Sequence, residues 1–71
     1  MDTKDFYIKL SSRIKFLREN AHLTQEQLAE KADLSLDFLG KLEINYRKPS
    51  LRTIVKLANA LKIEPFEILK F

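Results

Sequence analysis

The twenty residues from Thr24 to Glu43 hold two short helical patterns separated by three turn residues, and they constrain this chain more than any other stretch. Thr24 precedes the first pattern and Gln27 stands three positions later, so the two side chains can satisfy two free backbone donors as a capping box. This predicts a helix that begins at Gln25. Its buried face consists of Leu28, Ala29 and Ala32, at spacings that stack on one side of a helix.

The turn between the two patterns spans residues 33–35. Ser35 can cap a second helix, which carries Leu39 and Leu42 inward. Asp33 is the turn residue that can supply a left-handed conformation, although less readily than glycine by roughly 1 kcal/mol. The pattern therefore predicts a helix, a tight turn and a second helix.

Composition excludes several classes of protein. With no cysteine and a single histidine, His22, the chain has neither a disulfide framework nor a thiolate metal site, and it has no recognisable catalytic set. The first residues lack the basic segment and apolar run of a secretion signal, and no stretch approaches the ~20 apolar residues that span a bilayer. We expect a soluble cytoplasmic protein with no enzymatic activity, cofactor, metal or small-molecule substrate.

A longer amphipathic pattern precedes the central stretch and predicts a helix over roughly Asp5 to Asn20. Asn20 can serve as its left-handed cap. Ile8 points away from the core side, which holds Phe6, Leu10, Ile14, Leu17 and Ala21.

Two further helices are predicted after the central stretch. Pro49 indicates a loop, and Ser50 then caps a helix whose apolar side holds Leu51, Ile54, Leu57, Ala58 and Leu61. Pro65 suits the first position of a short final helix. In that helix we expect Phe66 and Leu69 to lie inside, and Ile68 and Phe71 to be available to a partner.

Together these patterns predict an all-α domain, a compact bundle of five short helices that forms one unit over residues 1–71. The helix-turn-helix occupies about 24–43. A chain of 71 residues buries only about 60% of its unfolded surface, so oligomerisation would add stability.

The net charge of +3 is mild, but its distribution is uneven. From Ile44 to Lys62 there is no acidic residue and there are five basic ones, Arg47, Lys48, Arg52, Lys56 and Lys62. We expect a polyanion contact to include this segment, although a solvated loop and helix face would show the same charge.

Residues 11–69 resemble the Cro and phage-repressor type of helix-turn-helix, also called the Xre family, whose fold is lambda-repressor-like. The short C-terminal form, Pro65 to Phe71, is similar to the controller proteins of restriction-modification systems. The matching motifs are Ser11-Ser12-Arg13-Ile14-Lys15 with Arg18, Leu23-Thr24-Gln25-Glu26-Gln27-Leu28-Ala29, Leu34-Ser35, Leu42-Glu43 and Arg47-Lys48-Pro49-Ser50-Leu51.

This resemblance implies that the helix starting at Ser35 lies in the major groove of double-stranded DNA and that the protein binds a near-palindromic operator as a homodimer. It also implies an ion pair between Arg18 and Glu43. We interpret that pair as a structural clamp.

The candidate base-reading residues are Ser35, Leu36, Asp37 and Lys41, which lie in the first turn or opposite Leu39. Lys41 can donate to guanine and Asp37 can accept from cytosine, while Gly40 beside them allows a close approach to DNA. Asp37 and Lys41 stand four apart, however, and could form a salt bridge with each other instead.

Phosphate contacts are expected from helix N-termini and the basic loop. The candidates are Gln25, Asn45, Tyr46, Arg47 and Lys48, with Arg13 and Arg52 in addition. The sequence thus predicts a sequence-specific transcriptional regulator. The alternative is a protein-interaction module, for example an antitoxin-like partner, that keeps the fold without reading DNA.

Overall fold

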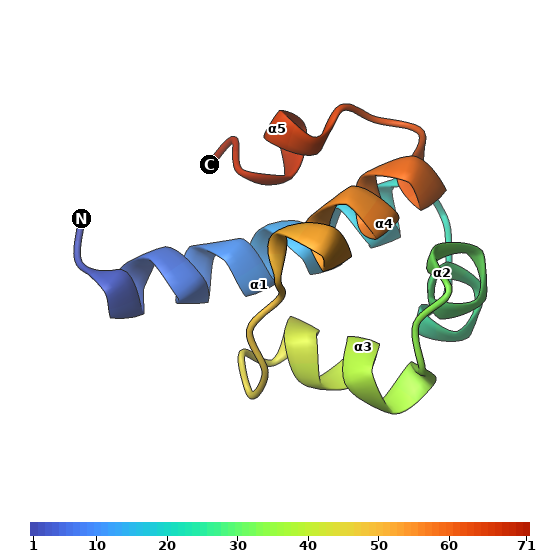
Figure 1. Cartoon of the computed structure of the whole chain (residues 1–71), viewed down its shortest axis with the longest axis horizontal. Helices are drawn as coiled ribbons and strands as arrows, with labels where there is room; N and C mark the ends of the chain where they lie inside the picture. Colours follow the sequence, from blue (N-terminus) through green and yellow to red (C-terminus); the bar gives the residue numbers. More distant parts are fainter.

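The structure, a computed structural model, describes all residues 1–71 and contains five helices. They are α1 (Thr3–Asn20), α2 (Gln25–Ala32), α3 (Leu36–Glu43), α4 (Leu51–Leu61) and α5 (Pro65–Ile68). In Figure 1, α1 runs across the middle of the molecule, α3 lies on one side of it and α5 on the other. The predicted all-α bundle is confirmed. None of the helices is long and apolar enough to cross a bilayer.

Side-chain caps set the helix boundaries. Thr24 and Gln27 form the predicted capping box, with bonds of 3.0 and 2.9 Å to each other's backbone N–H. Ser50 accepts from the Thr53 N–H at 3.1 Å. The first helix begins two residues earlier than predicted, because the Asp2 side chain caps it by accepting from the Asp5 N–H at 2.8 Å.

Every helix contributes to one core. Its buried apolar residues are Leu10, Ile14, Leu28, Ala29, Ala32, Leu39, Leu42, Ile54, Leu57, Ala58 and Ile68. The spacing of apolar residues therefore identified the inward faces of α2 and α3 correctly. This shared core fixes α3 with one face inward and the opposite face outward.

Ala21, which was predicted to lie on the core side of the first helix, is exposed. Three further sequence predictions about the fold were wrong. Asn20 stays helical, and the left-handed residue after α1 is His22 with φ of 60°. Leu51 is 80% exposed. Because side chains tilt toward the start of a helix, Leu51, the first residue of α4, points past the end of the core.

The third error concerns α5. Ile68 is fully buried, whereas Phe66 is 64% exposed and Leu69 is also exposed. The prediction had these residues the other way round. A helix of four residues is barely one turn, so its apolar positions show no periodicity from which an inward face could be read. Ile68 is therefore not a dimer residue, while Phe71 remains partly exposed.

Candidate nucleic-acid interface

The turn before α3 has the predicted conformation. Asp33 adopts φ of 56° and ψ of 49°, which is left-handed, and the Leu34 N–H donates to the Ala29 carbonyl at 2.9 Å. Ser35 then caps α3 by accepting from the Phe38 N–H at 3.1 Å. Short connections of this kind leave α3 little freedom to reorient against α2.

A buried ion pair holds the end of α3 against α1. The guanidinium of Arg18 donates to both carboxylate oxygens of Glu43, from Nε at 2.7 Å and from Nη2 at 3.0 Å. Gln25 donates to the same carboxylate at 3.0 Å, and Arg18 also donates to the Leu23 carbonyl at 2.8 Å. The expected clamp is thus present and includes a residue from α2.

The clamp also shifts the ionisation of Arg18. Its hydrogen bond to Glu43 raises the pKa of the guanidinium above its ordinary value, against the opposing effect of desolvation. The charges of Glu43 and Glu19 raise this pKa further. Arg18 therefore remains charged throughout the neutral pH range.

The outward face of α3 carries the two charged candidates for base reading. The side chain of Asp37 is 76% exposed and that of Lys41 is 37% exposed. Lys41 Nζ lies 2.9 Å from Asp37 Oδ2, so the alternative salt bridge is present in the free protein. Both residues nevertheless face solvent. The exposed apolar Leu36 and Ile44 lie at the two ends of the same helix.

Gly40 on this helix is not required by the fold. Its φ is not positive, and an added Cβ would meet only Gln25 Oε1, at the ordinary contact distance of 3.7 Å. Packing inside the chain therefore leaves room for alanine at this position.

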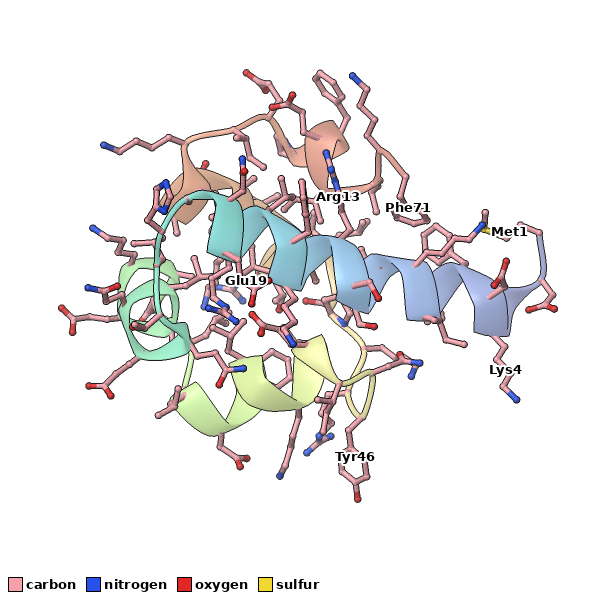
Figure 2. All side chains as sticks on the ribbon, turned by 180° about the vertical axis from the view of Figure 1, so that it is seen from behind. Met1, Lys4, Arg13, Glu19, Tyr46 and Phe71 are labelled. Carbon is pink, nitrogen blue, oxygen red and sulfur yellow. The ribbon has the colours of Figure 1, made fainter.

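The loop after α3 projects beside it. Asn45 is left-handed, with φ of 61°, and the N–H groups of Tyr46 and Arg47 both donate to the Lys41 carbonyl, at 2.8 and 3.2 Å. The Tyr46 ring points away from the body of the molecule on the α3 side of α1 (Figure 2). Asn45 is thus the left-handed residue of this loop, and Arg47 is exposed close to it in sequence.

The remaining predicted contacts are scattered. Arg52 is exposed in the first turn of α4. Gln25 donates one amide N–H to the clamp, which leaves its second amide N–H and its backbone N–H at the start of α2 for a phosphate. Arg13 points to the α5 side of α1, away from Tyr46 (Figure 2), and its Nε donates to the Glu67 carbonyl at 3.0 Å. Arg13 therefore lies on a different side of α1 from the loop after α3, and it does not contact the same phosphates as that loop.

The sequence reasoning missed an exposed apolar set on α4 and α5, two helices that pack against each other. It comprises Leu51, Val55, Phe66 and Leu69. Leu51 and Val55 are four residues apart and so share one face of α4. That spacing was visible in the sequence, but Leu51 had been assigned to the core.

Comparison with known proteins gives one family match. The Helix-turn-helix family (HTH_3) matches residues 14–68. The immunity repressor protein of Bacillus phage phi105 is 46% identical over 55 residues, which are 78% of this chain and 38% of the repressor. The HTH-type transcriptional regulator ImmR of Bacillus subtilis is 34% identical over 56 residues, which are 79% of this chain and 44% of the regulator. The chain thus spans less than half the length of these curated relatives.

A solved structure matches over nearly the whole chain. The restriction-modification controller protein C.AhdI from Aeromonas hydrophila is 40% identical, and the alignment has a TM-score of 0.85. It covers 87% of this chain and 94% of the controller protein. The likeness therefore extends to the arrangement of the helices.

Proposed function

The chain belongs to the Helix-turn-helix family, and from that premise we propose that it is a sequence-specific transcriptional regulator that binds DNA as a homodimer. This is a family of DNA-binding regulators and not a class of enzymes. The observation that carries the proposal is the division of α3. Its inner face is fixed by the core and the clamp, while Asp37 and Lys41 face solvent.

Base reading is assigned to the first turn and the outward face of α3. Ser35 and Leu36 lie where a recognition helix comes closest to base edges, and Lys41 can donate to guanine O6 or N7. On DNA, Lys41 exchanges its bond to Asp37 for one to a base, and Asp37 is then free to accept from cytosine. An exposed pair of this kind is worth only about 0.3 to 0.5 kcal/mol, so the exchange is energetically easy.

Phosphate binding is assigned to the backbone at the start of α2 and to the loop after α3. The N–H groups of Gln25 and Glu26 have no partner in the chain, because the first turn of a helix has no preceding carbonyls to bond, and Thr24 caps only the N–H of Gln27. Tyr46 and Arg47 are exposed in the loop, and Arg52 is exposed at the start of α4. These groups precede and follow α3 in the chain. Phosphate contacts on both sides of the reading helix would fix its position in one groove.

We assign the contact between the two copies of the dimer to the exposed apolar set on α4 and α5. Leu51 follows directly after the loop, so pairing through α4 brings the loops and the α3 helices of both copies toward one twofold axis. A twofold dimer presents its two reading helices about 34 Å apart, one turn of duplex. A near-palindromic operator follows from that symmetry. Acting on genomic DNA also implies the cytoplasmic location that we propose.

Binding to fragments of the host genome tests the proposal. Affinity should fall steeply with salt for every fragment, and about 10³-fold or more should separate the operator from scrambled DNA of the same composition. The double variant Lys41→Ala with Arg47→Ala should lose that discrimination. Equal, weak affinity for all fragments would reject the regulator. It would favour the protein-interaction module instead, for which the exposed Leu36 and Ile44 provide apolar contacts.

A further inference from the structure

The ammonium group of Lys48 makes two hydrogen bonds within the chain, although the residue itself is exposed. Its Nζ donates to the Asn45 carbonyl at 3.0 Å and to Asn45 Oδ1 at 2.7 Å. It also lies 5.4 Å from the centroid of the Tyr7 ring. An ammonium has three N–H donors, and here two are used by Asn45 while the charge faces an aromatic ring, an attractive arrangement.

Asn45 is the residue whose conformation sets the loop. It is left-handed, a conformation that asparagine tolerates better than most residues because its short polar side chain can form local hydrogen bonds. The two bonds from Lys48 supply them. Directly after Asn45, the N–H groups of Tyr46 and Arg47 converge on the Lys41 carbonyl. The shape of the loop therefore depends on Lys48.

Tyr7 comes from the other end of the sequence, in a part of α1 that precedes the family match at residues 14–68. Its ring is half-buried and meets Phe6 edge-on, with centroids 5.4 Å apart. Phe6 in turn packs on Phe71 at 5.3 Å. The ring beside Lys48 is thus held in place by its own neighbours.

We infer that Tyr7 and Lys48 form a brace that holds residues 44–48 in shape, and that Lys48 is a positioning residue for the loop and not a phosphate contact. The consequence for DNA rests on the proposed function. The brace itself is a property of the free protein, so the two can be tested separately.

Hydrogen exchange in the free protein tests the brace without DNA. Tyr7→Leu and Lys48→Met should each accelerate exchange of the Tyr46 and Arg47 amides by about tenfold. The core amide of Leu57 should keep its rate. Phe16→Leu makes the same kind of change at an exposed aromatic residue elsewhere on α1 and should leave the loop unchanged. The inference would be overturned if the Tyr46 and Arg47 amides kept their exchange rates in Tyr7→Leu. It would also be overturned if the Leu57 amide were accelerated by the same factor.

Operator binding by the same variants separates the two roles of Lys48. A brace predicts that Tyr7→Leu and Lys48→Met weaken binding by a similar factor, about tenfold, and that the double variant is no weaker than either. A phosphate contact predicts that Lys48→Met alone weakens binding and lowers the salt slope by about 0.9, with Tyr7→Leu unaffected. That second pattern contradicts the brace. Absence of operator binding by the wild type would contradict the proposed function, and the exchange rates would still decide the brace.

Discussion

At the scale of single residues, the clamp and the proposed reading face of α3 depend on different kinds of contact. Glu43 is buried and accepts hydrogen bonds from Arg18 and Gln25, so the stability of the fold depends on it. The exposed Asp37 has only one bond, to Lys41. Because the pKa of Arg18 is raised, the stabilisation from its charge is complete below the ordinary arginine pKa and is lost only as pH rises through the higher folded-state value.

Glu43→Ala should lower the free energy of unfolding by about 3 to 5 kcal/mol, because it leaves the Arg18 guanidinium without its buried partner. Urea denaturation measures this loss. The matched control is Asp37→Ala, which removes an exposed carboxylate from the same helix and should cost less than about 0.5 kcal/mol. Equal losses in the two variants would mean that the clamp does not support the fold.

Gly40→Ala should stabilise the free protein by about 0.5 to 1 kcal/mol, because glycine is unfavourable inside a helix and the structure has room for a methyl group. The same variant should weaken operator binding, since the methyl group separates the backbone of α3 from DNA. Thermal unfolding and a binding titration on one sample provide both values. A gain in stability with unchanged binding would remove Gly40 from the interface.

At the scale of helices, local signals predicted most of the fold. The caps at Thr24, Ser35 and Ser50 and the left-handed Asp33 each follow from side-chain chemistry within three residues, and all are present. The inward face of α5 could not be predicted, because a single turn has no period and only tertiary packing selects Ile68. The exposure of Leu51 likewise depends on where the neighbouring helices end.

Lys62→Gly should raise the free energy of unfolding by about 0.5 to 1 kcal/mol. Lys62 follows α4 in a left-handed conformation, with φ of 59°, that glycine adopts without strain. Lys31→Gly makes the same exchange inside α2, where it should cost about 1 kcal/mol. Chemical denaturation of both variants checks the opposite signs. Destabilisation by both would show that backbone strain at Lys62 is negligible.

At the scale of the whole molecule, the sequence predicted a partner surface near the C-terminus, and the structure changes which residues are available for it. Ile68 is buried, so the proposed surface comprises the exposed Phe66 and Leu69 together with Leu51 and Val55 on α4. The candidate DNA-facing residues were easier to predict, because helical geometry alone places Asp37 and Lys41 opposite Leu39. The bases that they would contact depend on the operator sequence, which the protein sequence does not contain.

Phe66→Glu should convert the proposed dimer to a monomer, because it introduces a charge into the proposed apolar pairing surface. Sedimentation equilibrium measures the change in mass, and circular dichroism should remain helical. Phe16→Glu places the same charge at another exposed aromatic residue, 55% exposed on α1, and should leave the dimer intact. Dissociation by Phe16→Glu alone would place the pairing surface on α1.

The central claim is that two copies of α3 read one duplex in successive major grooves. A hydroxyl-radical footprint of the wild-type protein on its operator tests it most directly. The account predicts two protected half-sites about 10 base pairs apart, related by a twofold axis. A single protected patch without symmetry, or uniform protection that follows no sequence, would contradict it.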